Sequence, residues 1–485
     1  MPVKEEMRRN LVRLLRDGTP FFPGIVGYEK TVLPALQNAI LARHDFILLG
    51  LRGQGKSRIL RGLAALLDDA VPVVPGCEIN DHPLAPICKR CRRTVTDASE
   101  IGWLGRPDRF REKLATPDVT MADLIGDIDP IKAANERRAL SDEEVIHYGI
   151  LPRTHRGIFA INELPDLQTR IQVGLLNIME ERDIQIRGFP VRLALDLCIV
   201  YTANPEDYTN RGTIITPLKD RIDSQIMTHY PRTVEDAIAI TGQEAWTRRE
   251  DVCRVPVPRL FRELVEEIGF QARRSEFVDQ ASGVSARLPI SAMENLVSNC
   301  ERRALRTGEE TVMPRLCDFY ALVPAIAGKI ELVYEGEREG VGAVARRILG
   351  QAVQAAFKRS FPDAYAAKPA KGRARPGPGT KDAPLDGTVY KPVLDWFAGG
   401  GRVELNDAMP AEDYARVLSR VPGLREIAET HLKPGPGELP LAMEFVLEGL
   451  HQNSLIARED LESAVSYKDM LKTMFESMET SRGEE

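Results

Sequence analysis

The 485-residue sequence has no uninterrupted run of about 18 apolar residues, the length that a helix needs to cross a bilayer. Its first 13 residues are rich in charge and contain no apolar core of the kind that a secretory signal carries. These two absences predict a cytoplasmic protein with no membrane partner.

Cysteine and net charge of one sign are also scarce. Seven cysteines spread over so long a chain do not resemble the dense pairing of a secreted disulfide framework. A net charge of -6 gives no sign of a chain built to coat nucleic acid, although a local basic surface stays open. No internal repeat is detectable.

The length indicates two to four domains, at roughly 100 to 200 residues each. Up to about residue 230, short apolar strands at 46–49, 71–74, 157–161 and 197–202 alternate with helical stretches, which is typical of a parallel sheet covered by helices. Helical periodicity dominates afterwards, and a stretch rich in Pro, Gly and basic residues predicts a flexible linker. The expected organisation is an N-terminal helix (1–20), an α/β domain (21–234), a helical domain (235–365), the linker (366–390) and a small helical module (391–485).

A phosphate-binding loop of the form G-x-x-x-x-G-K-[ST] follows the first strand, at residues 50–57. Its members Gly50, Gly53, Gln54 and Gly55 would let backbone N–H groups close on phosphate oxygens, at the positive end of a helix from 56 to about 67. Lys56 would neutralise the β and γ phosphates, and Ser57 would hold Mg²⁺. The loop therefore predicts binding of a nucleoside triphosphate such as ATP.

A second nucleotide-site element closes the strand 157–161, which ends in Asn162 and Glu163. In a Walker B strand an Asp normally orients the magnesium shell, and the following Glu orients or deprotonates the attacking water. Glu163 is placed for the second role, whereas Asn162 contributes an amide without negative charge. The alternative is a buried strand with an incidental polar end.

Three further polar residues fit a nucleotide site by their order in the chain. Asn204 follows the strand 197–202 and would lie beside the γ-phosphate, unless its Asn-Pro pair simply starts a turn. Arg221 and Arg287 could each reach a phosphate with a planar charged fork. Taken singly, each arginine is more typical of a surface charge or a helix-cap partner.

In this order the motifs resemble those of AAA+ ATPases, and more narrowly those of the magnesium-chelatase subunit I and MoxR branch. The closer resemblance lies in the tracts 23–27, 125–129, 149–157 and 202–207, and it covers about residues 20–330. It implies a P-loop AAA+ core, with a parallel sheet flanked by helices, followed by a helical lid domain and the small C-terminal module.

The resemblance also implies roles for individual residues. Ile25 and Val26 would border the adenine, Arg221 would act across a subunit boundary, and Arg287 would report nucleotide state from the lid. Such ATPases use ATP and Mg²⁺ and form rings of about six subunits. Many of them work with a von Willebrand A-type protein, to insert metals or mature other enzymes.

Two excursions fit inserts of that branch: a polar stretch at about 127–148, and an alternating stretch at about 183–196 with the pattern of a hairpin. Both would face the pore or the partner, and the alternative is a pair of surface loops without a partner. Three positions depart from the family pattern. Asn162 replaces Asp, Tyr28 stands where Gln is common, and Ile222 follows Arg221 in place of Phe.

One cluster is not explained by an ATPase. Cys88 and Cys91 form a C-x-x-C pair that can turn two thiolates toward one ion, and Cys77 with His82 could complete a tetrahedral Zn²⁺ site. A redox-active pair and unliganded cysteines are the alternatives.

The sequence thus leaves a principal hypothesis and two alternatives. The principal one is a ring-forming ATPase that remodels a partner or drives metal insertion. The alternatives are a nucleotide-gated scaffold with weak hydrolysis, which Asn162 favours, and a helicase-like or transcription-activating ring built on the same core.

Overall fold

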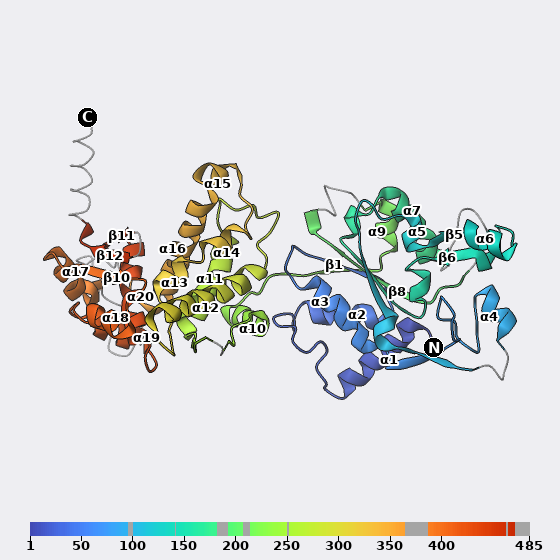
Figure 1. Ribbon diagram of the computed structural model, residues 1–485, viewed down its shortest axis with the longest axis horizontal. Coiled ribbons are helices and arrows are strands. Elements are labelled where there is room, and N and C mark those ends of the chain that lie inside the picture. The colour runs from blue at the N-terminus through green and yellow to red at the C-terminus, as the bar shows by residue number, and fades with distance from the viewer. Residues whose placement is uncertain are drawn as a thin grey trace, which may run out of the picture. The chain divides into compact units, whose positions relative to one another are not determined.

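The computed structural model describes residues 1–95, 100–140, 142–181, 193–206, 214–249, 252–363, 387–461 and 464–470. The chain divides into two compact units, Met1–Pro231 and Arg232–Glu485. Figure 1 shows an α/β arrangement in the first unit and a mainly helical one in the second.

The first unit is built on a five-stranded parallel sheet in the order β4-β7-β8-β1-β9. Its strands are β1 (Phe46–Leu49), β4 (Phe110–Leu114), β7 (Gly157–Asn162), β8 (Leu197–Ala203) and β9 (Ser224–Met227). Because parallel strands end at the same edge, the segments that follow β1, β7 and β8 meet there. The phosphate-binding loop, Glu163 and Asn204 all lie in those segments.

The sheet separates two apolar clusters. Along β1, Ile47 and Leu49 enter one cluster while Phe46 and Leu48 enter the other, because successive side chains of a strand point to opposite faces. Figure 1 shows α2 and α3 on one side of the sheet and α7 and α9 on the other. The helices of this unit are α1 (Val3–Arg16), α2 (Val32–Leu41), α3 (Lys56–Gly62), α4 (Lys89–Thr94), α5 (Met121–Leu124), α6 (Pro130–Glu136), α7 (Thr169–Glu181) and α9 (Thr216–Arg221).

Two predictions for this unit need correction. The expected strand at 71–74 forms as β2 (Ala70–Val73), but it pairs antiparallel with β3 (Gly102–Gly105) in a separate ribbon and not in the parallel sheet. One edge of the parallel sheet is instead β4, which carries charged residues and does not show the apolar run of a buried strand. The helix expected at 56–67 ends as α3 at Gly62 and continues as a 3-10 turn, Leu63–Leu66.

The expected insert at 127–148 is an ordered excursion. It begins in β5 (Gly126–Ile128), continues through α6 and the 3-10 turn Glu143–Val145, and returns in β6 (Ile146–Tyr148), which pairs antiparallel with β5. The expected hairpin at 183–196 lies largely outside the described residues, as does most of the expected linker at 366–390.

In the second unit the lid helices and the C-terminal module share one hydrophobic core, which extends from Phe261 to Tyr467. The module also contains a three-stranded antiparallel sheet in the order β10-β12-β11, in addition to its helices. The elements are α10 (Val234–Glu244), α11 (Arg259–Ala272), α12 (Arg287–Thr307), α13 (Leu316–Tyr320), α14 (Val323–Ala327), α15 (Tyr334–Glu339), α16 (Val341–Ser360), α17 (Lys391–Ala398), β10 (Val403–Asn406), α18 (Ala411–Leu418), α19 (Leu424–Leu432), α20 (Leu439–Gln452), β11 (Ala457–Asp460) and β12 (Ala464–Lys468).

A buried carboxylate joins these parts. Glu448 on α20 is fully buried and accepts hydrogen bonds from the hydroxyls of Tyr320 (2.6 Å) and Tyr467 (2.7 Å). Arg458 on β11 completes the network with an ion pair of 3.2 Å. A charge in this position is tolerated because each oxygen has partners.

Among the described residues, no helix has the length and apolar character needed to span a bilayer.

A second buried carboxylate in this unit has fewer partners. Glu266 on α11 is 3% exposed, and its Oε1 atom accepts no hydrogen bond from the described residues. Burial raises the pKa of Glu266 from 4.5 to about 7, although a hydrogen bond from Thr241 and the charge of Arg273 act in the opposite direction. The folded protein therefore holds a proton on Glu266 at pH values where the unfolded chain has lost it.

We expect the second unit to lose about 3 kcal/mol of stability as the pH rises from 4.5 to about 7, since the native state binds the extra proton in that window. Glu266→Gln should remove this loss, because an amide needs no proton. The measurement is denaturant unfolding at several pH values, followed by Trp246 fluorescence after Trp103 and Trp396 are changed to Phe. Glu263→Gln, which removes a partly exposed carboxylate from the same helix, is the matched control. Equal pH slopes for Glu266→Gln and wild type would contradict the assignment.

Candidate functional site

The phosphate-binding loop is held in a fixed shape at the end of β1. Gly53 and Gly55 adopt left-handed backbone angles (φ 75° and 74°), and α3 begins directly afterwards at Lys56. Lys56 is 7% exposed, and its ammonium group donates to the carbonyl of Gly50 and to Asn204 Oδ1, at 3.1 Å in the second case. The predicted phosphate lysine and the predicted sensor residue therefore meet at this edge of the sheet.

Gly50 allows a close approach that no other residue would permit. A Cβ atom at this position would lie 1.8 Å from Thr228 Oγ1 and 2.2 Å from Gln54 Oε1. The Thr228 hydroxyl, just beyond β9, donates to Gln54 Oε1 at 2.6 Å. This bond fastens the loop to the neighbouring strand, so Gln54 acts through its side chain as a support for the loop.

Two tyrosine side chains form hydrogen bonds with the backbone of the phosphate-binding loop. The Tyr28 hydroxyl lies 2.8 Å from the carbonyl oxygen of Gln54 and 2.7 Å from that of His229. Burial raises the pKa of Tyr28 to about 12, so the hydroxyl keeps its proton and can donate. The Tyr230 hydroxyl donates to the carbonyl of Arg52 at 2.8 Å. Tyr28, which departs from the family pattern, thus has a structural role beside the loop.

Ile25 and Val26 are half-buried in the segment that leads to Tyr28. Ile25 packs against the cluster formed by α1, α2 and α3, and its N–H donates to the carbonyl of Phe22 at 3.2 Å. An apolar segment linked to the loop through Tyr28 suits the flat face of a base. The adenine role of these two residues stays a prediction.

Glu163 follows β7 in an unusual backbone conformation. Its φ and ψ angles are 54° and 52°, in the left-handed region that non-glycine residues rarely occupy. Its N–H donates to Thr202 Oγ1 on β8 at 3.0 Å, which holds the turn against the neighbouring strand. Such strain costs of order 1–3 kcal/mol and is concentrated at functional sites, which supports Glu163 as a working residue.

Asn162 has a carboxylate beside it from another strand. Its Nδ2 atom lies 3.4 Å from Glu112 Oε2, on β4, and Glu112 forms an ion pair of 2.6 Å with Arg61. Arg61 is one turn along α3 from Ser57, which is exposed in the first turn of the helix. Oxygen ligands of the kind that Mg²⁺ prefers are therefore available on Ser57, Asn162 and Glu163, so the residues present fit this ion.

The two candidate arginines lie in different units. Arg221 ends α9 in the first unit, where it is half-exposed and its Nη1 atom donates to the carbonyl of Pro217 at 2.9 Å. Arg287 begins α12 in the second unit and is exposed, with its N–H donating to Ser285 Oγ at 3.1 Å. Their roles stay predictions.

Known proteins resemble part of this chain. No protein-family model matches it. The magnesium-chelatase 38 kDa subunit of Cereibacter sphaeroides is 28% identical over 241 residues, which make up 48% of this chain and 66% of that protein. The magnesium-chelatase subunit ChlI of Nostoc sp. is 30% identical over 243 residues, 46% of this chain and 58% of that protein. The ChlI homolog of Methanocaldococcus jannaschii is 28% identical over 228 residues, 45% of this chain and 57% of that protein.

Over about half of its length the chain is homologous to magnesium-chelatase subunit I. The matches span 57–66% of the length of these three relatives. Among solved structures, a BchI–BchD complex of magnesium chelatase from single-particle cryo-EM is similar to the chain, with a TM-score of 0.36 and 22% identity. That alignment covers 66% of this chain and 99% of the BchI–BchD chain. The strand order of the parallel sheet and the placement of the motifs at its edge support the AAA+ fold.

In this subunit I homologue, the structure brings three of the four predicted zinc ligands together. The sulfur atoms of Cys77, Cys88 and Cys91 lie within 4.8 Å of one another, and a carboxylate oxygen of Asp81 belongs to the same group. His82 is not in the group, and its Nδ1 atom accepts a hydrogen bond from the N–H of Leu84 at 3.0 Å. Asp81 therefore supplies the fourth candidate donor atom, which was predicted to come from His82.

Sequence reasoning missed Thr228, Glu112 and Asp81. Thr228 and Glu112 lie on or beside strands without a recognisable motif, so nothing in their neighbours marks them. Asp81 directly precedes His82, and only the fold decides which of the two side chains turns toward the sulfurs.

Proposed function

We propose that this protein is an ATP-hydrolysing ring motor, similar to magnesium-chelatase subunit I, that couples hydrolysis to remodelling of a partner protein or to metal insertion. The observation that carries the proposal is the convergence of Lys56, Asn204 and the strained Glu163 at one sheet edge, with the first two 3.1 Å apart. A passive phosphate site needs only the loop, whereas this edge also carries a base and a polar residue for the water.

The residues divide the work of hydrolysis as follows. Lys56 and the loop N–H groups neutralise the phosphate oxygens on which charge accumulates. Asn204 orients the attacking water, and Glu163 takes its proton as the water oxygen bonds to the γ-phosphorus and the bridging oxygen leaves with ADP. Ser57 and Asn162, at the end of β7, would hold Mg²⁺, which would supply further positive charge to the phosphate oxygens.

The relatives support a multi-subunit setting, because their names describe them as subunits of magnesium chelatase. We extend this to a ring of about six copies of this chain, acting with a von Willebrand A-type partner in the cytoplasm. In such a ring Arg221 would complete a neighbour's site, and Arg287 would contact the nucleotide from the lid.

The experiment that tests the motor is phosphate release by purified protein across a concentration series with Mg²⁺, beside a separate measurement of ATP binding. A specific activity that rises with protein concentration supports a site shared between subunits. Tight ATP binding with no turnover at any concentration would contradict an autonomous motor. The second candidate, a nucleotide-gated scaffold, would then account for ATP-dependent assembly without hydrolysis, and Asn162 is the residue that favours it.

Asn162→Asp is expected to lower the Mg²⁺ concentration required for tight ATP binding by roughly tenfold, because a carboxylate adds negative charge where the amide adds none. The measurement is a titration of ATP affinity against Mg²⁺, which does not require turnover. Asn162→Ala, which removes the amide without adding charge, is the control and should not show this gain. An unchanged Mg²⁺ dependence in Asn162→Asp would mean that the side chain does not face the ion.

A further inference from the structure

The loop between β2 and β3 gathers four metal-binding side chains from two segments. Cys77 and Asp81 come from its first turn, while Cys88 and Cys91 lie at the N-terminal end of α4. One donor atom from each lies within 4.8 Å of the others. Cys88 and Cys91 are buried, Asp81 is 0% exposed, and Cys77 is half-buried.

Backbone N–H groups are aimed at the donor atoms. The N–H of Asp81 donates to Cys77 Sγ at 3.4 Å, and that of Cys91 donates to Cys88 Sγ at 3.3 Å. The Asp81 carboxylate accepts from the N–H groups of Ile87 (3.1 Å) and Cys88 (3.0 Å). Hydrogen bonds of this kind orient metal ligands and leave each carboxylate oxygen a second lone pair for an ion.

Asp81 has no counter-ion within ion-pair distance in the described part of the chain. A fully buried carboxylate is costly unless a positive charge compensates it, and hydrogen bonds to neutral N–H groups supply only part of that compensation. The charge of Arg156 supplies a further part, and a divalent cation among the three sulfurs would bind a carboxylate oxygen directly. Three sulfurs and one oxygen within 4.8 Å of one another suit Zn²⁺ better than the harder ions, which prefer oxygen ligands alone.

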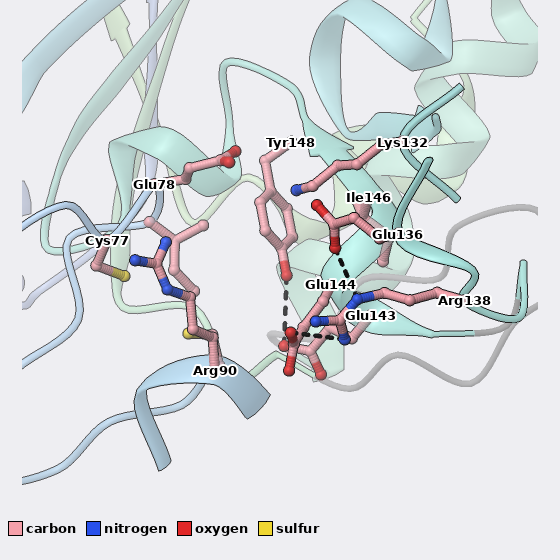
Figure 2. Close-up of a pocket in the computed structure, with 12 residues that line it drawn as sticks. Cys77, Glu78, Arg90, Lys132, Glu136, Arg138, Glu143, Glu144, Ile146 and Tyr148 are labelled. Atoms are coloured by element: carbon pink, nitrogen blue, oxygen red, sulfur yellow. Dashed lines mark hydrogen bonds and ion pairs between the residues drawn. The ribbon is translucent and has the colours of Figure 1, made fainter. Parts of the chain in front are cut away.

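The same loop supports the insert that begins at β5. Lys89 Nζ forms an ion pair with Asp142 at 2.8 Å, and Arg93 Nη1 forms one with Glu144 at 3.0 Å. Between loop and insert lies a cavity of about 310 Å³, lined by Cys77 and Cys88 on one side and by charged insert residues with Tyr148 on the other (Figure 2). The position of the insert therefore depends on this loop, which carries four potential metal ligands besides the apolar side chains that it packs into the core.

We propose that Cys77, Asp81, Cys88 and Cys91 bind one structural Zn²⁺ ion, which orders the loop of residues 74–95 and fixes the insert of residues 126–148 on it. A closed four-ligand site leaves no position for substrate, so the ion contributes to folding and not to chemistry. The proposal is independent of ATP hydrolysis, since neither the ligands nor the insert contains a residue assigned to phosphate transfer.

The test is the metal content of the full-length protein, purified under reducing conditions and measured by inductively coupled plasma mass spectrometry. We expect about one Zn²⁺ per chain, lost in Cys88→Ser and Cys91→Ser and retained in Cys253→Ser, a matched cysteine of the second unit. Asp81→Asn should weaken retention against a chelator, whereas His82→Ala should not. Release of zinc by His82→Ala with full retention in Asp81→Asn would overturn this ligand set.

A measurement on the wild-type chain tests the site even when the cysteine variants fail to fold. Co²⁺ exchanged into the site should give a thiolate charge-transfer band and intense visible bands, as tetrahedral sulfur coordination does. Zinc removal should raise hydrogen exchange in residues 74–95 and 126–148 and leave residues 46–57 unchanged. Only trace metal in the folded protein, or a Cys88–Cys91 disulfide found by thiol counting, would overturn the proposal.

Discussion

The Glu163→Gln variant is expected to bind ATP as tightly as the wild type and to hydrolyse it about 10²–10⁴-fold more slowly. The amide has the size and shape of the carboxylate but cannot take a proton from water. Glu163 also sits in a left-handed conformation that its N–H bond to Thr202 holds, and that backbone bond survives the substitution. The turn should therefore persist, so that the loss is chemical and not structural.

The measurement is single-turnover hydrolysis with saturating protein, together with equilibrium ATP binding. Asp166→Asn is the matched control, because it removes an exposed carboxylate three residues further along the same turn. We expect wild-type turnover for the control. A Glu163→Gln rate within a few-fold of wild type, or an equal loss in both variants, would show that Glu163 is not the base.

Much of the nucleotide edge could be predicted, because its residues are linked by chain topology. A glycine loop between an apolar strand and a helix indicates β1 and α3, and the apolar runs of β7 and β8 indicate neighbouring buried strands. Asn204 was expected beside the γ-phosphate that Lys56 would neutralise, and since parallel strands end at one edge the two side chains meet there, 3.1 Å apart.

The edges of the sheet were harder to predict. The sequence of β4, Phe-Arg-Glu-Lys-Leu, has three consecutive charged residues between two apolar ones and lacks the apolar run of β7, so Glu112 could not be placed beside Asn162. β2 shows an apolar strand pattern, but pattern alone does not specify its partner, and it pairs outside the parallel sheet.

In the second unit, the sequence pattern could not predict which side chains meet in the core. The periodicity of α20 predicts a helix, yet Glu448 in its middle would be read as an exposed charge. Its partners Tyr320, Tyr467 and Arg458 lie far from it or on other elements, and only the assembled fold brings them to one carboxylate. Helical pattern therefore identified the parts of this unit but not the shared core that joins them.

The Arg221→Ala variant is expected to lose about 10³–10⁵-fold in hydrolysis rate if Arg221 serves the γ-phosphate of a neighbouring subunit. Arg221 is half-exposed at the end of α9, as a residue that reaches a neighbouring subunit must be. Arg221→Lys should recover little, because an ammonium group cannot form the planar two-pronged contact of a guanidinium with phosphate.

Mixing subunits decides whether the arginine acts across the boundary. In rings assembled from equal amounts of Arg221→Ala and Glu163→Gln, about one quarter of interfaces pair an intact Glu163 with an intact neighbouring Arg221. Hydrolysis should therefore reappear on mixing two inactive proteins. Lys56→Met mixed with Glu163→Gln is the control, since both changes affect the same subunit's half of the site and no mixture restores it. A mixture of Arg221→Ala and Glu163→Gln that stays inactive, although the rings exchange subunits, would place Arg221 in its own subunit's site and remove the reason for a shared one.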